Sequence, residues 1–341
     1  MSGEAGRVVD VHAHAMPLPI LEWLVEQGLA DLSGLSDGIV RLDPRVSGVG
    51  PGAPLPLPPA MHDVSVRLGQ MDQAGVDVHA VSLPPFLMAT TFPIASEADS
   101  ALVSEVIRRG NDALAEYVAQ APDRLVALGG VPLGTGEAAT EAARCLDELG
   151  MAGIAICSQG AGQDLDAEVN EPLWALLSQR SVFTFLHPSA SPAPARTKDF
   201  WFPQLVGYPM ETALAVARLI FAGVTTRHPF PLCLAHGGGC LPSLRGRLSM
   251  GWDRKPQAHT IDTDPREHLD RLYYDTAVFD EELLRGLVAM VGPEQVLAGT
   301  DFPFDLAEWD PVGFVTRALG KDAAELVLGR TAAGLLGLQD S

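Results

Sequence analysis

The sequence predicts an α/β protein in which eight parallel strands alternate with helices and close into a (β/α)8 TIM-type barrel. Eight short apolar runs, rich in β-branched residues, are separated by segments that repeat apolar residues at helical spacing. The runs are almost continuously apolar, as expected of parallel strands that are buried on both faces. The chain has 341 residues, 47% of them hydrophobic, which is enough for a large core.

The predicted strands are spaced along the whole chain. They are Val8 to His12, Val76 to Leu83, Leu125 to Pro132, Gly153 to Cys157, Val182 to His187, Pro231 to His236, Leu272 to Thr276 and Val296 to Asp301. Helical spacing is clear in Glu97 to Gln120, Glu137 to Leu149, Pro209 to Gly223 and Glu281 to Val291. The third and seventh strands have the weakest patterns, and loss of either would favour an open, doubly wound sheet.

Two long proline-rich segments interrupt this alternation. Pro17 to Ala60 follows the first strand, and its second half is too rich in proline for a regular helix. We interpret residues 17–60 as a lid or insertion subdomain within a single barrel domain of residues 1–341. Pro188 to Pro203 follows the fifth strand. Both segments leave the carboxyl ends of strands, so both are expected to cover the mouth where barrel enzymes bind substrate.

Composition excludes several classes of partner. A net charge of -20 without a run of Lys and Arg disfavours binding to nucleic acid or to anionic membranes. The first ten residues lack the apolar core of a signal peptide, and the most apolar helical segment, Thr212 to Val224, is too short to cross a bilayer. The four cysteines show no C-x-x-C spacing. We therefore expect a cytoplasmic protein with buried free thiols.

The most informative local pattern is the pair His12 and His14 at the end of the first predicted strand. Alternate side chains of a strand face the same side, about 6.5 to 7 Å apart. Two imidazoles at that separation can share one metal ion through bonds of about 2 Å. Asp10 has the same parity and could orient a ligating histidine. Two ordinary buried histidines would give the same pattern, so the pair alone leaves both interpretations open.

Three other predicted strands also end in a metal-binding or titratable side chain. These are His187 after the fifth strand, His236 after the sixth and Asp301 after the eighth. The carboxyl ends of barrel strands converge on the active site, so these side chains are expected to meet the histidine pair. Three imidazoles and one carboxylate suit zinc, with manganese or iron as alternatives. The remaining histidines are expected to be structural or solvated: His62, His79, His228, His259 and His268.

Five candidates for one metal site leave one to act as a general acid or base, and we assign this role to His236. Gly237 to Gly239 follow it directly and could bring backbone N–H groups close to an anionic ligand. A tight turn from strand to helix would require the same glycines.

Four motifs, in this order, resemble the amidohydrolase superfamily. They are Val9-Asp10-Val11-His12-Ala13-His14, Leu186-His187-Pro188, Ala235-His236-Gly237-Gly238-Gly239 and Gly299-Thr300-Asp301-Phe302-Pro303. Met71 to Asp77, Tyr208 to Thr212 and Tyr274 to Phe279 add to the similarity. The chain is most similar to the amidohydrolase 2 branch that contains aminocarboxymuconate semialdehyde decarboxylase and related metal-dependent, non-oxidative decarboxylases. The similarity covers most of the chain.

The resemblance implies a role for each site residue. In that branch one divalent metal ion is held by the His-x-His pair, the strand-five histidine and the strand-eight aspartate, without a carbamylated lysine. The matching residues here are His12, His14, His187 and Asp301. His236 would handle the proton on water or substrate, and Asp301, briefly protonated, could also supply it. Arg247 matches a family arginine on the helix after the sixth strand, which implies substrate contact and a homodimer.

One stretch departs from the family pattern. The aminocarboxymuconate enzyme holds a substrate carboxylate with an arginine in the insertion after strand one, whereas Gly52 to Ala60 contains none. We therefore expect a different carboxylic acid, bound in a more apolar or aromatic pocket to which Phe200 and Trp201 contribute.

The resulting hypothesis is a metal-dependent decarboxylase of a small aromatic or conjugated unsaturated carboxylic acid. The alternative within enzymes is a hydrolase of an amide, lactone or ester, or a hydratase, because metal-activated water can attack a carbonyl directly. A catalytically silent binding protein with a barrel fold would be expected to lose some of the five site residues, and all five are present.

Overall fold

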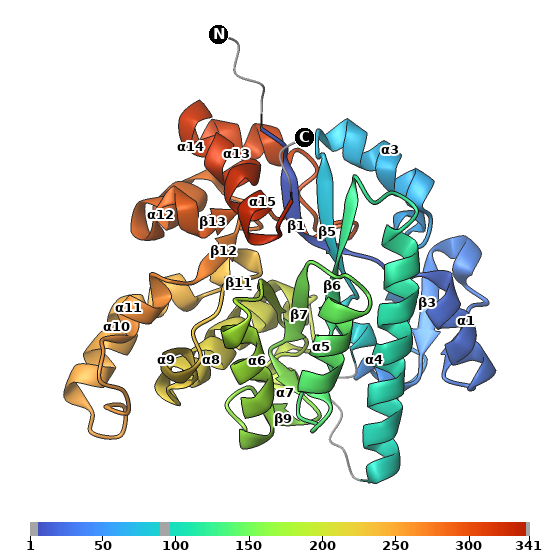
Figure 1. Cartoon of the computed structure of the whole chain (residues 1–341), viewed down its shortest axis with the longest axis horizontal. Helices are drawn as coiled ribbons and strands as arrows, with labels where there is room; N and C mark the ends of the chain where they lie inside the picture. The colour runs from blue at the N-terminus through green and yellow to red at the C-terminus, as the bar shows by residue number, and fades with distance from the viewer. Residues whose placement is uncertain (1–5, 89–95, 339–341) are drawn as a thin grey trace.

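The computed structural model describes residues 6–88 and 96–338, and its centre is one parallel sheet of eight strands (Figure 1). In spatial order these are β1 (Val9–His14), β5 (Val78–Ser82), β6 (Leu125–Gly130), β7 (Gly153–Cys157), β10 (Thr184–His187), β11 (Leu232–Leu234), β12 (Tyr273–Asp275) and β13 (Val296–Leu297). Each overlaps a predicted run. The two weakest predictions, now β6 and β12, are both present, so the sheet contains all eight predicted strands.

The chain after β13 runs beside β1, so the sheet forms a nearly closed barrel. The N–H of Val11 donates to the carbonyl of Ala298 at 2.9 Å, and the N–H of Asp301 donates to the carbonyl of His12 at 2.9 Å. Side chains in or next to seven of the strands meet in one buried cluster with the C-terminal helix: Val9, Val11, Val78, Ala80, Leu128, Ala155, Phe183, Phe185, Cys233, Ala235, Leu297, Ala332 and Leu336. Such a cluster forms only where the sheet curves round on itself.

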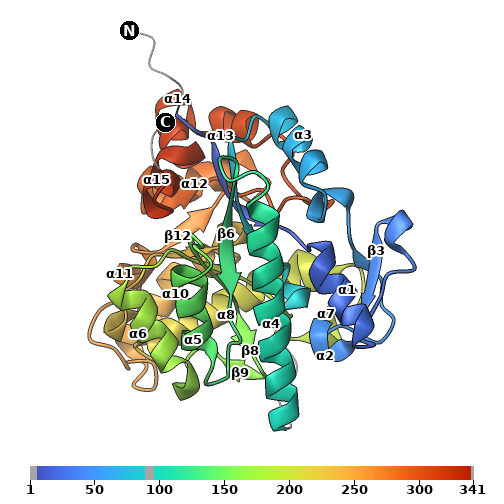
Figure 2. The same cartoon turned by 45° about the vertical axis from the view of Figure 1, so that its right-hand side comes forward.

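Helices cover the outside of the barrel (Figures 1 and 2). They are α3 (Val64–Ala74), α4 (Glu97–Val118), α5 (Ala138–Asp147), α6 (Glu171–Gln179), α8 (Tyr208–Phe221), α9 (Val224–Arg227), α10 (Leu241–Arg254), α11 (Pro265–Leu269), α12 (Glu281–Val291), α13 (Pro311–Leu319), α14 (Lys321–Glu325) and α15 (Thr331–Leu335). The four helices predicted with bounds are all present, with ends within two residues of the prediction. The spacing of apolar residues therefore predicted both the strands of the barrel and the helices around it.

The start of α3 is determined by a side-chain cap. The Asp63 carboxylate accepts hydrogen bonds from the N–H groups of Ser65 and Val66, at 2.8 and 3.2 Å. These bonds satisfy two of the N–H groups that a helix start leaves unpaired. The helix ends at Gly75, whose φ of 69° is the left-handed conformation that glycine adopts easily. This short helix lies against the barrel beside the first two strands.

Residues 17–60 form a helix followed by a small antiparallel sheet. The elements are α1 (Leu18–Glu26), β2 (Ala30–Asp31), β3 (Ile39–Leu42), α2 (Pro44–Ser47) and β4 (Leu55–Pro56). Strand β3 pairs with both β2 and β4. The helix α1 packs beside the long helix α4, as both views show (Figures 1 and 2). As predicted, the proline-rich second half contains no long helix.

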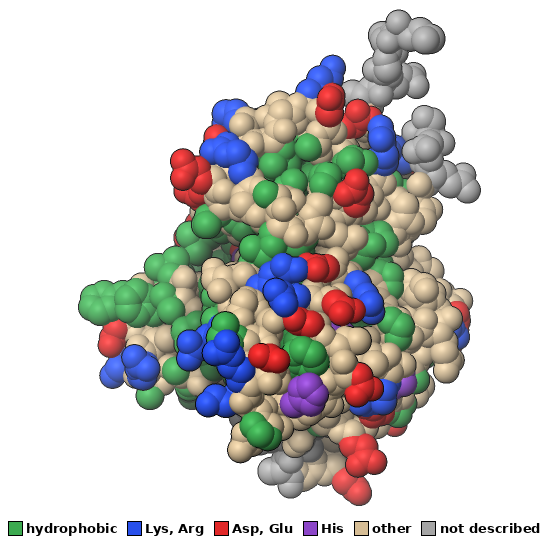
Figure 3. All heavy atoms as spheres, turned by 90° about the vertical axis from the view of Figure 1, so that its left-hand side faces the viewer, with side chains coloured by type: hydrophobic (Ala, Val, Ile, Leu, Met, Phe, Trp, Pro, Cys, Tyr) green, Lys and Arg blue, Asp and Glu red, His purple; other side chains and the backbone are tan. Residues whose placement is uncertain are grey.

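The segment after β10 contains a short helix, α7 (Pro194–Thr197), and then a π-helix, η5 (Pro203–Gly207), that leads into α8. A separate hairpin, β8 (Gln159–Gly160) with β9 (Gln163–Asp164), follows β7. Within the described ranges, no helix is long and apolar enough to cross a membrane. All four cysteines are free thiols; three are buried as expected, and Cys240 is partly exposed. Figure 3 shows acidic and basic side chains interspersed over the face that carries α10 and α11, without a basic stripe.

Candidate metal centre

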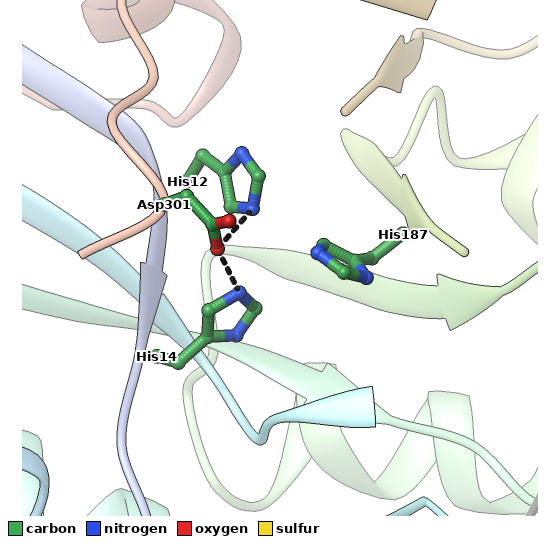
Figure 4. Close-up of side chains that lie close together, drawn as sticks. All are labelled: His12, His14, His187 and Asp301. Carbon is green, nitrogen blue, oxygen red and sulfur yellow. Dashed lines mark ion pairs between the residues drawn. The ribbon is translucent and has the colours of Figure 1, made fainter. Parts of the chain in front are cut away.

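Four of the predicted side chains converge at the carboxyl ends of the strands (Figure 4). His12 and His14 end β1, His187 ends β10 and Asp301 follows β13. Each offers one ligand atom, and these atoms all lie within 4.8 Å of one another. The three histidines are buried, and the Asp301 side chain is 13% exposed. The strand-end argument therefore identified the group correctly.

The ring of each ligating histidine is oriented by a partner at Nδ1. His12 Nδ1 lies 2.6 Å from a carboxylate oxygen of Asp275. His14 Nδ1 lies 3.2 Å from the hydroxyl of Ser82, and His187 Nδ1 lies 2.7 Å from the carbonyl of Pro188. Such contacts fix the tautomer and direct the other ring nitrogen toward a metal ion. In all three rings this nitrogen is Nε2.

Within the described part of the chain, no group forms a hydrogen bond with the ligand atoms that are directed into the site. They are Nε2 of His12, His14 and His187, together with Oδ1 of Asp301. Asp301 Oδ1 lies 3.1 Å from His12 Nε2 and 3.3 Å from His14 Nε2. Buried polar atoms are seldom left without a partner, and a divalent cation would satisfy all four. Three imidazoles and one carboxylate, oriented in this way, fit a metal ion of the zinc or manganese type.

Electrostatics in the site favour a positive charge next to Asp301. Burial lowers the pKa of His12, but the neighbouring carboxylates of Asp301 and Asp275 outweigh it and raise the pKa to about 10. Burial lowers the pKa of His14 and, together with the neighbouring histidines, that of His187. Burial opposes ionisation of Asp301, yet His12 holds its pKa well below the usual range. The carboxylates therefore stabilise a cation, proton or metal ion, at His12.

Asp275 is a functional residue that the strand-end argument missed. It ends β12, so the same position that identified His187 and Asp301 could have identified it. One of its oxygens contacts His12 Nδ1, and the other accepts a hydrogen bond from the N–H of Gly237 at 2.7 Å. Asp275 therefore contacts both the metal ligand His12 and the turn that carries His236.

The expectation that Asp10 orients a ligating ring is wrong. Its oxygens accept from the N–H groups of His12 and Thr300, at 2.9 and 3.2 Å, and from the hydroxyl of Thr300 at 2.5 Å. The pairing of β1 with β5 shifts register between Asp10 and Ala13. This irregularity breaks the strict alternation that the parity argument assumed. Asp10 therefore holds the backbone next to two ligands rather than a ligand ring.

His236 lies beside the four ligands. Its Nε2 is 3.6 Å from Asp301 Oδ2, and its ring centroid is 5.0 Å from that of His187. Its Nδ1 is buried without a hydrogen bond, and its φ of 56° is uncommon for a residue other than glycine. Such a conformation persists only where the surrounding fold enforces it. The turn therefore holds this imidazole next to the metal centre.

The three glycines after His236 form a tight turn instead of an anion site. The N–H of Gly237 donates to Asp275, that of Gly238 to the Ala235 carbonyl, and that of Gly239 to the His236 carbonyl. All three donors are occupied within the protein, so the anion-binding interpretation is wrong. A Cβ on Gly239 would lie 2.3 Å from the carbonyl oxygen of Pro209, which explains why the turn needs glycine.

Aromatic side chains stand next to the ligands, but they are not the ones predicted. The Phe304 ring lies 5.4 Å from that of His14 and 6.3 Å from that of Phe86, between centroids. The Tyr208 ring lies 6.0 Å from that of His187 and nearly perpendicular to it. Burial raises the pKa of Tyr208, so its hydroxyl stays protonated. Phe304 follows Asp301 by three residues, and this proximity in sequence was the available signal.

The three predicted substrate-binding residues lie on the surface of the chain. Phe200 is 80% exposed, with its ring against Phe202 at 5.5 Å, and Trp201 is 63% exposed. Arg247 is exposed on α10. The structure brings none of the three into the cluster of four ligand residues.

Comparison with known proteins agrees with this site. The sequence model of the amidohydrolase family Amidohydro_2 matches residues 9–338. The chain is 33% identical over 282 residues to 2-amino-3-carboxymuconate-6-semialdehyde decarboxylase of Dictyostelium discoideum, covering 81% of this chain and 77% of that protein. It is 28% identical over 283 residues to gamma-resorcylate decarboxylase of Rhizobium sp. (strain MTP-10005), covering 78% and 84%.

A solved structure has the same fold. It is dihydroxybenzoic acid decarboxylase from Polaromonas sp. JS666 with bound manganese and the inhibitor 2-nitroresorcinol, and it matches with a TM-score of 0.76 and 23% identity over 98% of each chain. The family model covers nearly the whole barrel and includes every residue of the metal centre. The chain therefore belongs to the amidohydrolase family.

Proposed function

We propose that the chain is a metal-dependent, non-oxidative decarboxylase of an aromatic or conjugated unsaturated carboxylic acid. The observation that carries the proposal is the buried group of three histidines and Asp301, whose four donor atoms lack partners. The relatives named above decarboxylate carboxymuconate-type and hydroxybenzoate-type acids, as their names state.

We further propose zinc as the resident ion, with manganese as the alternative because one relative's structure contains it. His12, His14, His187 and Asp301 would hold the ion. When bound, it would supply a positive charge that polarises a substrate oxygen next to the carboxylate that is lost.

In this reaction His236 supplies the proton. Breaking the bond between the carboxylate carbon and the ring or chain carbon releases CO₂ and leaves an electron pair on the remaining carbon. That carbon must then gain one proton. His236 Nε2 lies next to the metal centre and 3.6 Å from Asp301 Oδ2, so it can deliver the proton, with the second oxygen of Asp301 as the other candidate donor.

The walls of the site favour a flat, unsaturated substrate. Phe304 and Tyr208 present ring faces or edges beside His14 and His187, where an aromatic acid can stack. Residues 17–60 are proposed as a lid within the single barrel domain. Phe200 and Trp201 would then act at the rim, closing over bound substrate and excluding water.

Arg247 is the proposed contact for the substrate carboxylate. It is exposed on α10, so we propose that it contributes across a homodimer interface. Sedimentation at micromolar concentration should give the mass of two chains, and Arg247→Ala should raise KM for an acidic substrate. A mass of one chain would refute the dimer.

The reaction is tested by product analysis with the metal-loaded protein. A panel of hydroxybenzoates and muconate-like acids is incubated with the enzyme while CO₂ release and product mass are followed. We expect at least one acid to lose about 44 mass units, the mass of CO₂, and His236→Ala to slow this loss by about 10²- to 10⁴-fold. If no acid releases CO₂ while a lactone, ester or amide is cleaved, the hydrolase alternative replaces the proposal.

A further inference from the structure

A fully buried arginine lies directly behind the metal centre. Arg67 is on α3, outside the group of ligands, and its side chain is 0% exposed. Burying a guanidinium is costly unless its donors are satisfied. Among the fully buried side chains of the described residues, only that of Trp174 is larger, and Arg67 is the largest that carries a charge. The proposed chemistry assigns it no role.

The guanidinium of Arg67 contacts the strand that carries two ligands. One terminal nitrogen, Nη2, donates to the backbone carbonyl of His14. Its Nε donates to Tyr117 Oη at 2.9 Å and to the carbonyl of Ala60 at 3.2 Å. The single N–H at Nε is shared between these two oxygens, whereas each terminal nitrogen has donors of its own that point in fixed directions. Arg67 therefore anchors the backbone at His14 to the elements that surround α3.

The other terminal nitrogen begins a relay to Asp10. Arg67 Nη1 lies 3.0 Å from His79 Nδ1. Arginine can only donate, so His79 Nδ1 must accept, and the proton of the neutral ring is on Nε2. Burial and the charge of Arg67 lower the pKa of His79 well below its usual value, which keeps the ring neutral. His79 Nε2 faces Asp10 Oδ2 at 3.5 Å, an electrostatic contact that is longer than an ordinary hydrogen bond.

The relay ends on the backbone of two other ligand-bearing segments. Asp10 accepts hydrogen bonds from the N–H of His12 and from the N–H and hydroxyl of Thr300, the residue before Asp301. Arg67 also stacks over the ring of Phe302, 4.8 Å from its centroid, on the other side of Asp301. The contacts of this one side chain thus lead to His12, to His14 and to both neighbours of Asp301.

We propose that Arg67 is a positioning residue that sets the affinity of the metal centre, by holding three of its four ligands through the carbonyl of His14, the His79–Asp10 relay and the ring of Phe302. The fourth ligand, His187, contacts the rings of His12 and His14, but within the described residues it has no contact with Arg67, His79, Asp10 or Phe302. The inference rests on the metal site and not on the identity of the substrate. Metal binding measured without substrate therefore tests it separately from the decarboxylase proposal.

The test compares two arginines that both bind backbone carbonyls. Arg67→Met keeps the length of the side chain and removes the guanidinium. Arg124→Met is the matched control, because Arg124 donates to the carbonyls of Asp77 and Val76 at the amino end of β5, away from the ligands. Binding of Mn²⁺ and Zn²⁺ to the full chain is measured by competition with a chromophoric chelator.

We expect Arg67→Met to weaken metal binding by about 10- to 100-fold, the range seen when a residue that orients metal ligands is removed. Arg124→Met should bind metal within about two-fold of the unaltered chain, even if it lowers the melting temperature. The absorption bands of the cobalt-loaded Arg67→Met protein should also change, because they report ligand geometry. Equal metal affinity in Arg67→Met and the unaltered chain would overturn the proposal.

Two further variants keep the proposal testable if Arg67→Met does not fold. Arg67→Lys retains the charge but cannot contact His14, His79 and Tyr117 together. His79→Leu interrupts only the relay to Asp10. We expect both to weaken metal binding, and His79→Leu to do so less because the bond to the His14 carbonyl remains. Metal affinity unchanged in both folded variants would overturn the proposal equally.

Discussion

The metal ligands at the strand ends are almost completely buried, whereas the aromatic side chains in the loop after β10 are exposed. At the strand ends, three histidines and Asp301 are held so closely that their ligand atoms lie within 4.8 Å, and each histidine ring has a partner at Nδ1. In the loop, Phe200 and Trp201 are 80% and 63% exposed. Metal binding therefore depends on rigid elements that are already in place. The exposed loop side chains can become buried only when substrate or a second chain binds against them.

The largest expected effect is at the strand ends. Asp301→Ala and His187→Ala should each remove the metal ion and activity together, because each deletes one of four donor atoms in a buried site. Metal content by plasma emission spectrometry and CO₂ release are measured on the same samples. Removal of the ion from the unaltered chain with a chelator should abolish activity, and adding it back should restore it. Full metal occupancy in either variant would contradict the assignment.

The next effect separates proton transfer from metal binding. His236→Ala should retain the ion yet reduce kcat by about 10² to 10⁴, the usual range for loss of a general acid or base. His259→Ala is the control, because His259 stacks on Trp252 at the surface, 4.9 Å between centroids. Loss of metal from His236→Ala would make His236 a ligand, and near-normal kcat would remove its role.

A smaller effect is expected from Asp275, which contacts the metal ligand His12 but is not itself a ligand. Asp275→Asn keeps the shape of the side chain but weakens its acceptor toward His12 Nδ1, so metal affinity should fall by about 10- to 100-fold. The variant is compared with Asp270→Asn, since Asp270 pairs with Arg245 at the surface. Unchanged metal affinity in Asp275→Asn would show that His12 is oriented by its surroundings without this carboxylate.

The smallest expected effects show whether the substrate stacks on Phe304, near the strand ends, or on Trp201, in the loop after β10. Phe304→Ala should raise KM by up to about 10-fold, since an aromatic pair contributes about 0.5 to 1.5 kcal/mol. Trp201→Ala should raise KM less, because the exposed Trp201 side chain must be ordered when substrate binds, and this entropy cost offsets part of the contact. Steady-state kinetics on the acid identified by product analysis give both values. A larger increase in KM for Trp201→Ala would assign substrate stacking to the loop.

The sequence located most of the fold because its signals are local. Gly153–Cys157 is a short apolar run and Glu281–Val291 repeats apolar residues at helical spacing, so each pattern lies within one segment. The loop conformations were harder to predict, because the exposed rings at 200 and 201 have few neighbours to determine where they lie. Whether residues 17–60 move as a lid stays a prediction.

The order of residues states which side chains end the strands, and parallel strands in a barrel bring such ends together. His12, His14, His187 and Asp301 could therefore be identified without coordinates. The surroundings of these four residues depend on the folded chain. Asp275 orients His12 across 263 residues of chain, and a register shift in β1 turns Asp10 toward backbone N–H groups. Periodicity describes a chain one segment at a time, whereas these contacts depend on the register between segments far apart in sequence.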